Sequence, residues 1–358
     1  MMDYRKTILI MTDADGAETA KAIKLRLTQA DASVAVIVIG VNELQNSIVE
    51  AAKNYLWKKD GFTRRRWEAH RLAQAEKALD EIPKGVPKFD ATKLKHVKMQ
   101  NILMRYRPAL MLYLTPQELG IGLSARNKLM PECKIIALCP GVVGDLRWIY
   151  PGIDGYWVEN AGVLTTLANH GVAERQMRVV TFPFGESEEA KERKVGETRP
   201  SVLVEVPPAD EGAVRPLLNA LKGETHRFSI DIAAGEDREA YAYAVEQGFR
   251  VCNEGGDVAG LRRNADVVLT RPHGGVLPVL FGADKQIVFY AARGKTEIRA
   301  AAFLAKESPL WDGTEKIGRL LEEASRPEVV SERALARQNR YSLRARSDLI
   351  ESICQLIG

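Results

Sequence analysis

Short runs of apolar residues alternate with stretches of helical spacing along this chain. Thr7–Met11 is an apolar run, followed by a polar turn at residues 12–16 and by residues 17–27, whose apolar positions have helical spacing. Further strands are expected at Ser33–Ile39, Pro108–Leu114 and Lys134–Cys139. Strands that are apolar throughout and separated by helices are typical of a parallel sheet covered on both faces.

Residues 185–200 interrupt this alternation, because they are charged and nearly free of apolar side chains, which predicts a linker. Strands are expected again at Ser201–Val206, Phe228–Ile232, Phe249–Cys252, Val267–Leu269 and Gln286–Tyr290. We therefore predict an α/β protein of two doubly wound, Rossmann-like domains facing a cleft, over residues 1–184 and 201–330. In such sheets ligands bind at the carboxyl ends of the strands.

The charged residues are distributed unevenly along the chain. The 358 residues carry a net charge of only +4, but residues 53–107 hold 15 Lys/Arg and 6 Asp/Glu, a local net of +9. Within this region cations and aromatic rings are mixed, at Lys53, Trp57, Lys58, Lys59, Arg64, Arg65, Arg66 and Trp67. Such mixing suits a surface of anionic lipid headgroups. The alternative is two exposed helices whose aromatic rings pack inward. Nucleic acid is not expected, because no recognition motif accompanies the charge.

The spacing of the cysteines and the hydropathy of the chain indicate where in the cell the protein is expected. The four cysteines form no CxxC pair, which favours a reducing cytoplasm and argues against a structural zinc site. We expect no metal. No apolar run approaches the roughly 20 residues that span a bilayer, and Met1–Lys6 leads into a strand without a signal peptide. A cytoplasmic protein, peripheral on the inner face of the membrane, is the expectation.

The most informative stretch is Ala265–Gly275, an apolar strand that leads into Arg271, Pro272, His273, Gly274 and Gly275. A helical pattern follows from Val276. Glycines let backbone N–H groups approach a phosphate, and a helix N-terminus adds partial positive charge. Arg271 and His273 are candidate further donors, and Lys295 is a candidate for neutralising a diphosphate. An ordinary tight turn, with Lys295 as a surface solubiliser, is the alternative.

Several segments in one order resemble the GT-B glycosyltransferases. Trp148–Val158 (WIYPGIDGYWV) is similar to the pattern W-x-x-P-x-V-D-x-Y-x-V, and Gly171-Val172 and Phe182-Pro-Phe184 follow it. The chain resembles in particular the diacylglycerol glycosyltransferase and monogalactosyldiacylglycerol synthase group, related to the lipid II N-acetylglucosaminyltransferase.

The resemblance implies a function. It implies inverting transfer of a hexose from a nucleotide-diphosphate sugar, a UDP-sugar by expectation, to a hydroxyl of a lipid or other amphipathic acceptor. No cofactor beyond this donor is implied. It also implies that a C-terminal helix within residues 331–358 crosses back to the N-terminal domain.

Some family positions are changed in this chain. The N-terminal turn lacks the family's His, and the family's ribose-binding Glu falls on Leu280. The segment Gly294–Arg299 is similar to the family's G-Q-E-x-x-N, with Glu297 retained and the Gln and Asn replaced. Glu297 is therefore expected to reach a donor hydroxyl, and a charged position in a solvated loop is the alternative. These replacements support an alternative function, a catalytically inactive relative that binds a ligand or a partner protein. A sugar-nucleotide epimerase is a third possibility.

Three carboxylates are candidates for the base that removes the proton of the acceptor hydroxyl: Asp13, Asp15 and Asp145. Two carboxylates two residues apart can raise each other's pKa. The alternative is structural, because Asp is favoured in turns and at helix N-termini, and Asp145 is placed to cap the turn into Trp148. Strand-Asp-x-Asp-Gly also resembles the first motif of haloacid-dehalogenase-type phosphatases, but no late acidic pair supports that chemistry.

Overall fold

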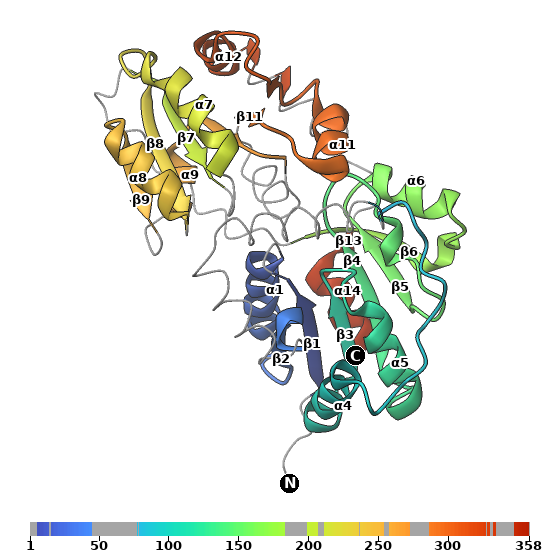
Figure 1. Cartoon of the computed structure of the whole chain (residues 1–358). Coiled ribbons are helices and arrows are strands. Elements are labelled where there is room, and N and C mark those ends of the chain that lie inside the picture. The colour runs from blue at the N-terminus through green and yellow to red at the C-terminus, as the bar shows by residue number, and fades with distance from the viewer. Residues whose placement is uncertain are drawn as a thin grey trace. The chain divides into compact units, whose positions relative to one another are not determined.

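The computed structural model describes residues 6–13, 16–44, 77, 79–182, 199–206, 211–235, 237–253, 258–272, 286–326, 328–329, 332–333 and 347–357. The chain divides into two compact units (Figure 1). Unit 1 comprises Met1–Glu186 and Tyr341–Gly358, and unit 2 comprises Ser187–Arg340.

Unit 1 contains a seven-stranded sheet in the order β13-β6-β5-β4-β3-β1-β2, in which all neighbouring strands are parallel. The strands are β1 (Thr7–Thr12), β2 (Ala35–Gly40), β3 (Leu110–Tyr113), β4 (Lys134–Cys139), β5 (Gly155–Val158), β6 (Met177–Thr181) and β13 (Ser347–Asp348). The helices are α1 (Ala17–Ala30), α4 (Leu94–Tyr106), α5 (Leu119–Leu129), α6 (Ala161–Asn169) and α14 (Leu349–Ile357), with 3-10 turns η1 (Val41–Leu44), η2 (Leu146–Trp148) and η3 (Glu174–Gln176).

The continuous apolar strands of unit 1 are buried on both faces. In β1, Ile8 and Ile10 pack in one cluster with α1 and α14, whereas Leu9 and Met11 pack in another with α4 and α5. Successive side chains of a strand point to opposite faces, so a strand covered on both faces must be apolar at consecutive positions. Ile8–Met11 of β1 and Leu110–Tyr113 of β3 have this pattern.

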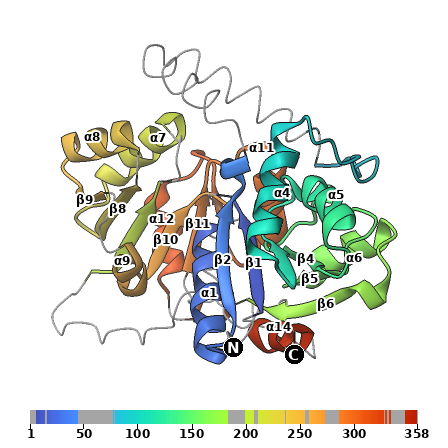
Figure 2. The ribbon, with the colours of Figure 1, turned by 90° about the horizontal axis from the view of Figure 1, so that it is seen from below.

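The C-terminal helix α14 completes the core of unit 1. Leu349, Ile350 and Ile353 join the cluster built on α1, and α14 lies beside α1 and β6 (Figure 2). The Nζ atoms of Lys134 and Lys6 donate to the last carbonyls of the helix, those of Leu356 and Ile357. Cations at a helix C-terminus are favourable. The helical pattern of the sequence starts at residue 331, and the described helix covers its last part.

Unit 2 contains a six-stranded sheet in the order β12-β11-β10-β7-β8-β9, again parallel throughout. The strands are β7 (Ser201–Glu205), β8 (Ser229–Gly235), β9 (Arg250–Asn253), β10 (Val267–Thr270), β11 (Gln286–Tyr290) and β12 (Leu310–Trp311). The helices are α7 (Glu211–Lys222), α8 (Arg238–Glu246), α9 (Val258–Asn264), α11 (Gly294–Leu304) and α12 (Ile317–Ala324).

The core of unit 2 repeats the arrangement of unit 1. Val202 and Val204 face the cluster formed with α7, α8 and α12, and Leu203, which points the other way, is also buried. The α/β fold of two Rossmann-like domains predicted from the sequence is confirmed. Strand positions agree to within a few residues; β8, for example, continues to Gly235 rather than ending at Ile232.

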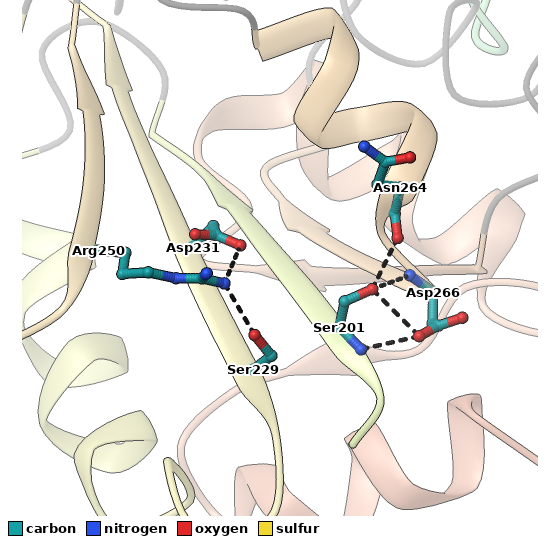
Figure 3. A network of polar contacts seen from close by, with 6 residues as sticks. All are labelled: Ser201, Ser229, Asp231, Arg250, Asn264 and Asp266. Atoms are coloured by element: carbon teal, nitrogen blue, oxygen red, sulfur yellow. Dashed lines mark hydrogen bonds and ion pairs between the residues drawn. The ribbon is translucent and has the colours of Figure 1, made fainter. Parts of the chain in front are cut away.

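Polar side chains tie together the amino ends of the unit 2 strands (Figure 3). The Ser201 amide and hydroxyl donate to Asp266 Oδ2 at 2.8 and 3.1 Å, and Arg250 bridges Ser229 and Asp231 at 2.8 Å each. These contacts fix the start of neighbouring strands. They lie at the edge opposite to the carboxyl ends, so these groups have a structural role.

The family-like segment Trp148–Val158 also has a structural role. Trp148 is buried in the core, and Asp154 Oδ2 accepts a hydrogen bond of 2.7 Å from the amide of Ile135 on β4. The hydroxyl of Tyr156 lies 3.2 Å from Tyr150 N and 3.1 Å from its carbonyl. The segment thereby holds the β4–β5 connection in place. Among the described residues, no helix has the length and apolarity needed to span a membrane.

Candidate functional site

The topology of each sheet marks one place for a ligand. In unit 1 the chain runs from β1 to β2 on one side and then to β3 on the other, so the strand order reverses between β1 and β3. In unit 2 the reversal lies between β7 and β10. Doubly wound sheets bind ligands outside the carboxyl ends of the strands at this switch point. The candidate site residues are therefore those at the ends of β1, β3, β7 and β10.

At the unit 1 switch point, Asp13 follows β1 directly. Its Oδ1 accepts a hydrogen bond of 3.1 Å from the amide of Gly16, the N-cap residue of α1. Its Oδ2 accepts none from the described residues. The turn is tight, because a Cβ on Gly16 would lie 2.5 Å from Thr12 Oγ1 and 3.2 Å from Leu114 Cβ. One oxygen of Asp13 thus shapes the turn. Asp15 lies outside the described residues.

Asp145 is engaged by a neighbour on both of its oxygens. Oδ1 accepts from the amide of Arg147 at 2.9 Å and caps η2, and the Arg147 guanidinium contacts Oδ1 and Oδ2 at 2.6–3.0 Å. This is the structural role that the sequence offered as the alternative for Asp145. The geometry thus favours Asp13 over Asp145 as a base.

Replacing Asp145 by alanine is expected to lower the free energy of unfolding of unit 1 by about 1 kcal/mol, the usual value of an N-cap. Asp145→Asn keeps a capping oxygen and loses only the ion pair, so it is expected to lie between wild type and Asp145→Ala. Urea unfolding followed by tryptophan fluorescence checks this order, since Trp148 and Trp157 belong to unit 1. Equal stability of all three proteins would show that the cap is unimportant.

A further acidic side chain of unit 1, Glu118, was not predicted from the sequence. Glu118, just before α5, has a left-handed backbone with φ of 61° and an ion pair with Lys95 of α4. Left-handed backbone is unfavourable for a residue with a side chain. No sequence signal other than a charge near a strand end marks this residue.

At the unit 2 switch point, Arg271 follows β10 and is bound to Glu297. The guanidinium donates to both carboxylate oxygens of Glu297, at 3.1 Å from Nε and 2.6 Å from a terminal nitrogen. The two side chains are only 11% and 13% exposed. Glu297 Oε2 also accepts from the amide of Arg293 at 2.8 Å. Glu297 therefore lies in the first turn of α11, largely buried, and the solvated-loop alternative is wrong.

The neighbouring strand brings a second ion pair, which the sequence analysis missed. Glu205 ends β7, and its Oε1 accepts a 2.6 Å hydrogen bond from Arg262 Nε of α9. The register pairs Leu269 with Val204, so Glu205 lies next to Thr270 at the switch point. The signal was present: a carboxylate that ends an apolar strand needs a partner, because burial of an unpaired charge is costly.

The remaining predicted residues divide by location. Lys295 lies in the first turn of α11. His273, Gly274 and Gly275 lie outside the described residues, as do all the cationic and aromatic positions predicted for lipid contact, from Lys53 to Trp67. Within the described ranges, no group of three or more His, Cys, Asp or Glu side chains is placed to hold a metal ion.

No family model matches the chain, and no curated protein matches it in sequence. Solved structures match over nearly the whole length. The glycotransferase of kitacinnamycin has 14% identity and a TM-score of 0.63, covering 99% of this chain and 100% of that chain. An S. aureus MnaA–UDP structure has 10% identity, a TM-score of 0.62 and coverages of 94% and 92%.

The spinosyn rhamnosyltransferase SpnG complexed with thymidine diphosphate has 12% identity, a TM-score of 0.57 and coverages of 99% and 100%. At these identities the likeness establishes the fold. The chain is therefore a two-domain protein with the GT-B fold.

Proposed function

We propose that this protein is a glycosyltransferase that moves a hexose from a nucleotide-diphosphate sugar to a hydroxyl of a lipid or other amphipathic acceptor. The observation that carries the proposal is a GT-B fold whose unit 2 switch point is flanked by two arginines, Arg262 and Arg271. The similar structures of MnaA with UDP and of SpnG with thymidine diphosphate support a nucleotide ligand. A UDP-sugar is the proposed donor.

On the donor side, the sequence His273-Gly274-Gly275 after β10 is proposed to hold the diphosphate. Backbone amides and cations offset the charge that develops on the leaving group, so no metal is required. Arg271 would position this segment against α11 through Glu297, and Lys295 of α11 would add a further cation. Glu297 is proposed to reach a donor hydroxyl.

On the acceptor side, Asp13 is proposed as the base, with Asp15 as its neighbour in the turn. The carboxylate takes the proton of the acceptor hydroxyl, whose oxygen attacks the anomeric carbon from the face opposite to the diphosphate. The bond from that carbon to the diphosphate oxygen breaks, and the nucleoside diphosphate leaves with the electron pair. This displacement inverts the anomeric configuration.

A lipid acceptor is supported by the cationic surface of unit 1. Residues 91–117 contain no Asp or Glu, and within them α4 and its flanks carry Lys93, Lys95, Lys98, Arg105 and Arg107. Leu94 and Met104 of α4 are 43% and 53% exposed. Exposed apolar side chains among cations suit an anionic membrane surface. We propose a cytoplasmic protein at the inner face of the membrane, related to the diacylglycerol glycosyltransferase group.

Thermal unfolding with UDP, GDP, TDP, ADP and their sugar conjugates tests the donor site. A ligand at 100 times its Kd is expected to stabilise the protein by about 2.7 kcal/mol, a shift on the order of 5–10 °C. The shift should occur with one nucleotide class and disappear when His273 and Gly275 are both replaced. No shift with any of these ligands would contradict the proposal.

A second candidate function is a catalytically inactive relative that binds a ligand or partner protein. The observation in its favour is that Arg271 and Asp145 are held by ion pairs within the chain, while Leu280 replaces the expected glutamate. Nucleotide binding without transfer or hydrolysis of a labelled donor would favour this function. Transfer that is lost in the Asp13→Ala/Asp15→Ala double variant would support the enzyme. Conversion of the free nucleotide sugar without acceptor would indicate an epimerase.

A further inference from the structure

Arg262 occupies a distinctive position at the unit 2 switch point. Its Nε is fixed by Glu205, whose side chain is only 8% exposed, while Arg262 itself is 22% exposed. The backbone carbonyl of Glu205 accepts a 3.0 Å hydrogen bond from the hydroxyl of Tyr290, which anchors this residue to β11 as well. The guanidinium therefore sits at the carboxyl end of β7 on a buried support.

The terminal amino groups of Arg262 have no acceptor among the described residues, because the contact with Glu205 uses Nε alone. The Arg262 side chain is partly exposed, whereas the Glu205 carboxylate that supports it is buried. Arg271, in contrast, commits Nε and a terminal nitrogen to Glu297. Of these two arginines, Arg262 is the one that uses a single nitrogen in its ion pair, as far as the described residues show.

The sequence after β7 indicates why a side-chain donor is needed at this strand end. In doubly wound domains the first strand–helix turn is often glycine-rich and supplies backbone N–H groups to a phosphate. Here Val206 is followed by Pro207 and Pro208, and proline has no N–H. A side-chain donor at this strand end would supply what the two prolines do not.

We propose that Arg262 binds the diphosphate of the nucleotide through its terminal amino groups, and that Glu205 is a positioning residue that fixes the guanidinium plane. The inference rests on the proposed function and adds a binding residue to it. A guanidinium presents parallel N–H donors that match two oxygens of a phosphate, which a lysine ammonium does not.

Isothermal titration calorimetry with UDP and TDP, and with uridine and thymidine as matched nucleosides, tests the proposal. Arg262→Met is expected to weaken diphosphate binding about ten- to a hundred-fold, the usual effect of losing a hydrogen bond to a charged group. Nucleoside binding should not change. Arg263→Met, one residue along α9, makes the same charge change and is expected to leave diphosphate affinity within about three-fold of wild type.

Two further variants separate binding from folding. Arg262→Met leaves the Glu205 carboxylate buried beside an apolar chain, so the double variant Glu205→Gln/Arg262→Met removes both charges and should fold while still losing diphosphate affinity. Glu205→Gln alone keeps the cation but releases its orientation. It is expected to weaken diphosphate binding several-fold without weakening nucleoside binding, which a purely structural role would not produce.

The outcomes distinguish the two proposals. If wild type binds UDP or TDP and the folded double variant binds equally well, the role of Arg262 is overturned and the proposed function stands. Equal weakening of nucleoside and diphosphate binding would also overturn it. If wild type binds no nucleoside diphosphate, both the proposed function and this inference fail.

Discussion

Replacing Gly122 by alanine is expected to destabilise unit 1 by about 3 kcal/mol or more, at the upper end of the cost of overpacking. A Cβ at this position would lie 1.7 Å from the hydroxyl oxygen of Tyr113 and 2.8 Å from its Cζ. Tyr113 is fully buried on β3, so a shift of its ring would have to displace packed neighbours. Urea unfolding followed by tryptophan fluorescence measures the loss.

The substitution Tyr113→Phe is expected to restore stability to the Gly122→Ala protein. The Tyr113 hydroxyl has no hydrogen-bond partner in the described structure, so removing it alone should be neutral or stabilising. In the double variant the closest clash is gone and much of the lost stability should return. Gly223→Ala is the control, because its nearest neighbour is the Ala220 carbonyl at 4.0 Å. A Gly122→Ala protein as stable as this control would show that the β3–α5 packing is not as described.

Replacing Arg271 by methionine is expected to destabilise unit 2 by about 3 kcal/mol, because a largely buried carboxylate loses its guanidinium partner. Glu297 is 13% exposed, and among the described residues it would keep the hydrogen bond from the amide of Arg293. Differential scanning calorimetry is applied to the wild type, to Arg271→Met, to Glu297→Gln and to the double variant. The four stabilities give the coupling energy between the two side chains.

The double variant Arg271→Met/Glu297→Gln should recover most of the stability. The glutamine oxygen can still accept from the Arg293 amide, and no charge is left without its partner. Because this protein is expected to be folded, its UDP affinity reports what Arg271 itself contributes to nucleotide binding. Independent, additive losses from the two single variants would contradict a direct ion pair.

The fold was predictable because the apolar pattern that specifies its strands lies within short segments of the sequence. A strand such as β1, covered on both faces, needs apolar side chains at consecutive positions, as at Ile8–Met11, and this pattern is visible without any knowledge of neighbours. The cap at Asp145 was also predictable as an alternative, because capping acts over two or three residues.

The candidate site was less predictable, because it depends on residues that meet only through the sheet. Glu205 and Arg262 are 57 residues apart, and Arg271 and Glu297 are 26 apart. Charged residues at strand ends and on helices are common in sequences, and no spacing rule selects these pairs. His273 to Gly275 and the lipid-contact positions from Lys53 to Trp67 stay predictions, since they lie outside the described residues.

By itself, the sequence determined two parallel α/β domains, because burial on both faces of a sheet imposes an apolar pattern that is read one residue at a time. Only the tertiary structure decided the strand order, and with it the switch points at Asp13 and at Glu205. It also decided which charges are paired with each other, as in Arg271 with Glu297 and Arg262 with Glu205. The physical reason is that an ion pair depends on distance in space, and parallel strands bring distant parts of the chain within hydrogen-bonding reach.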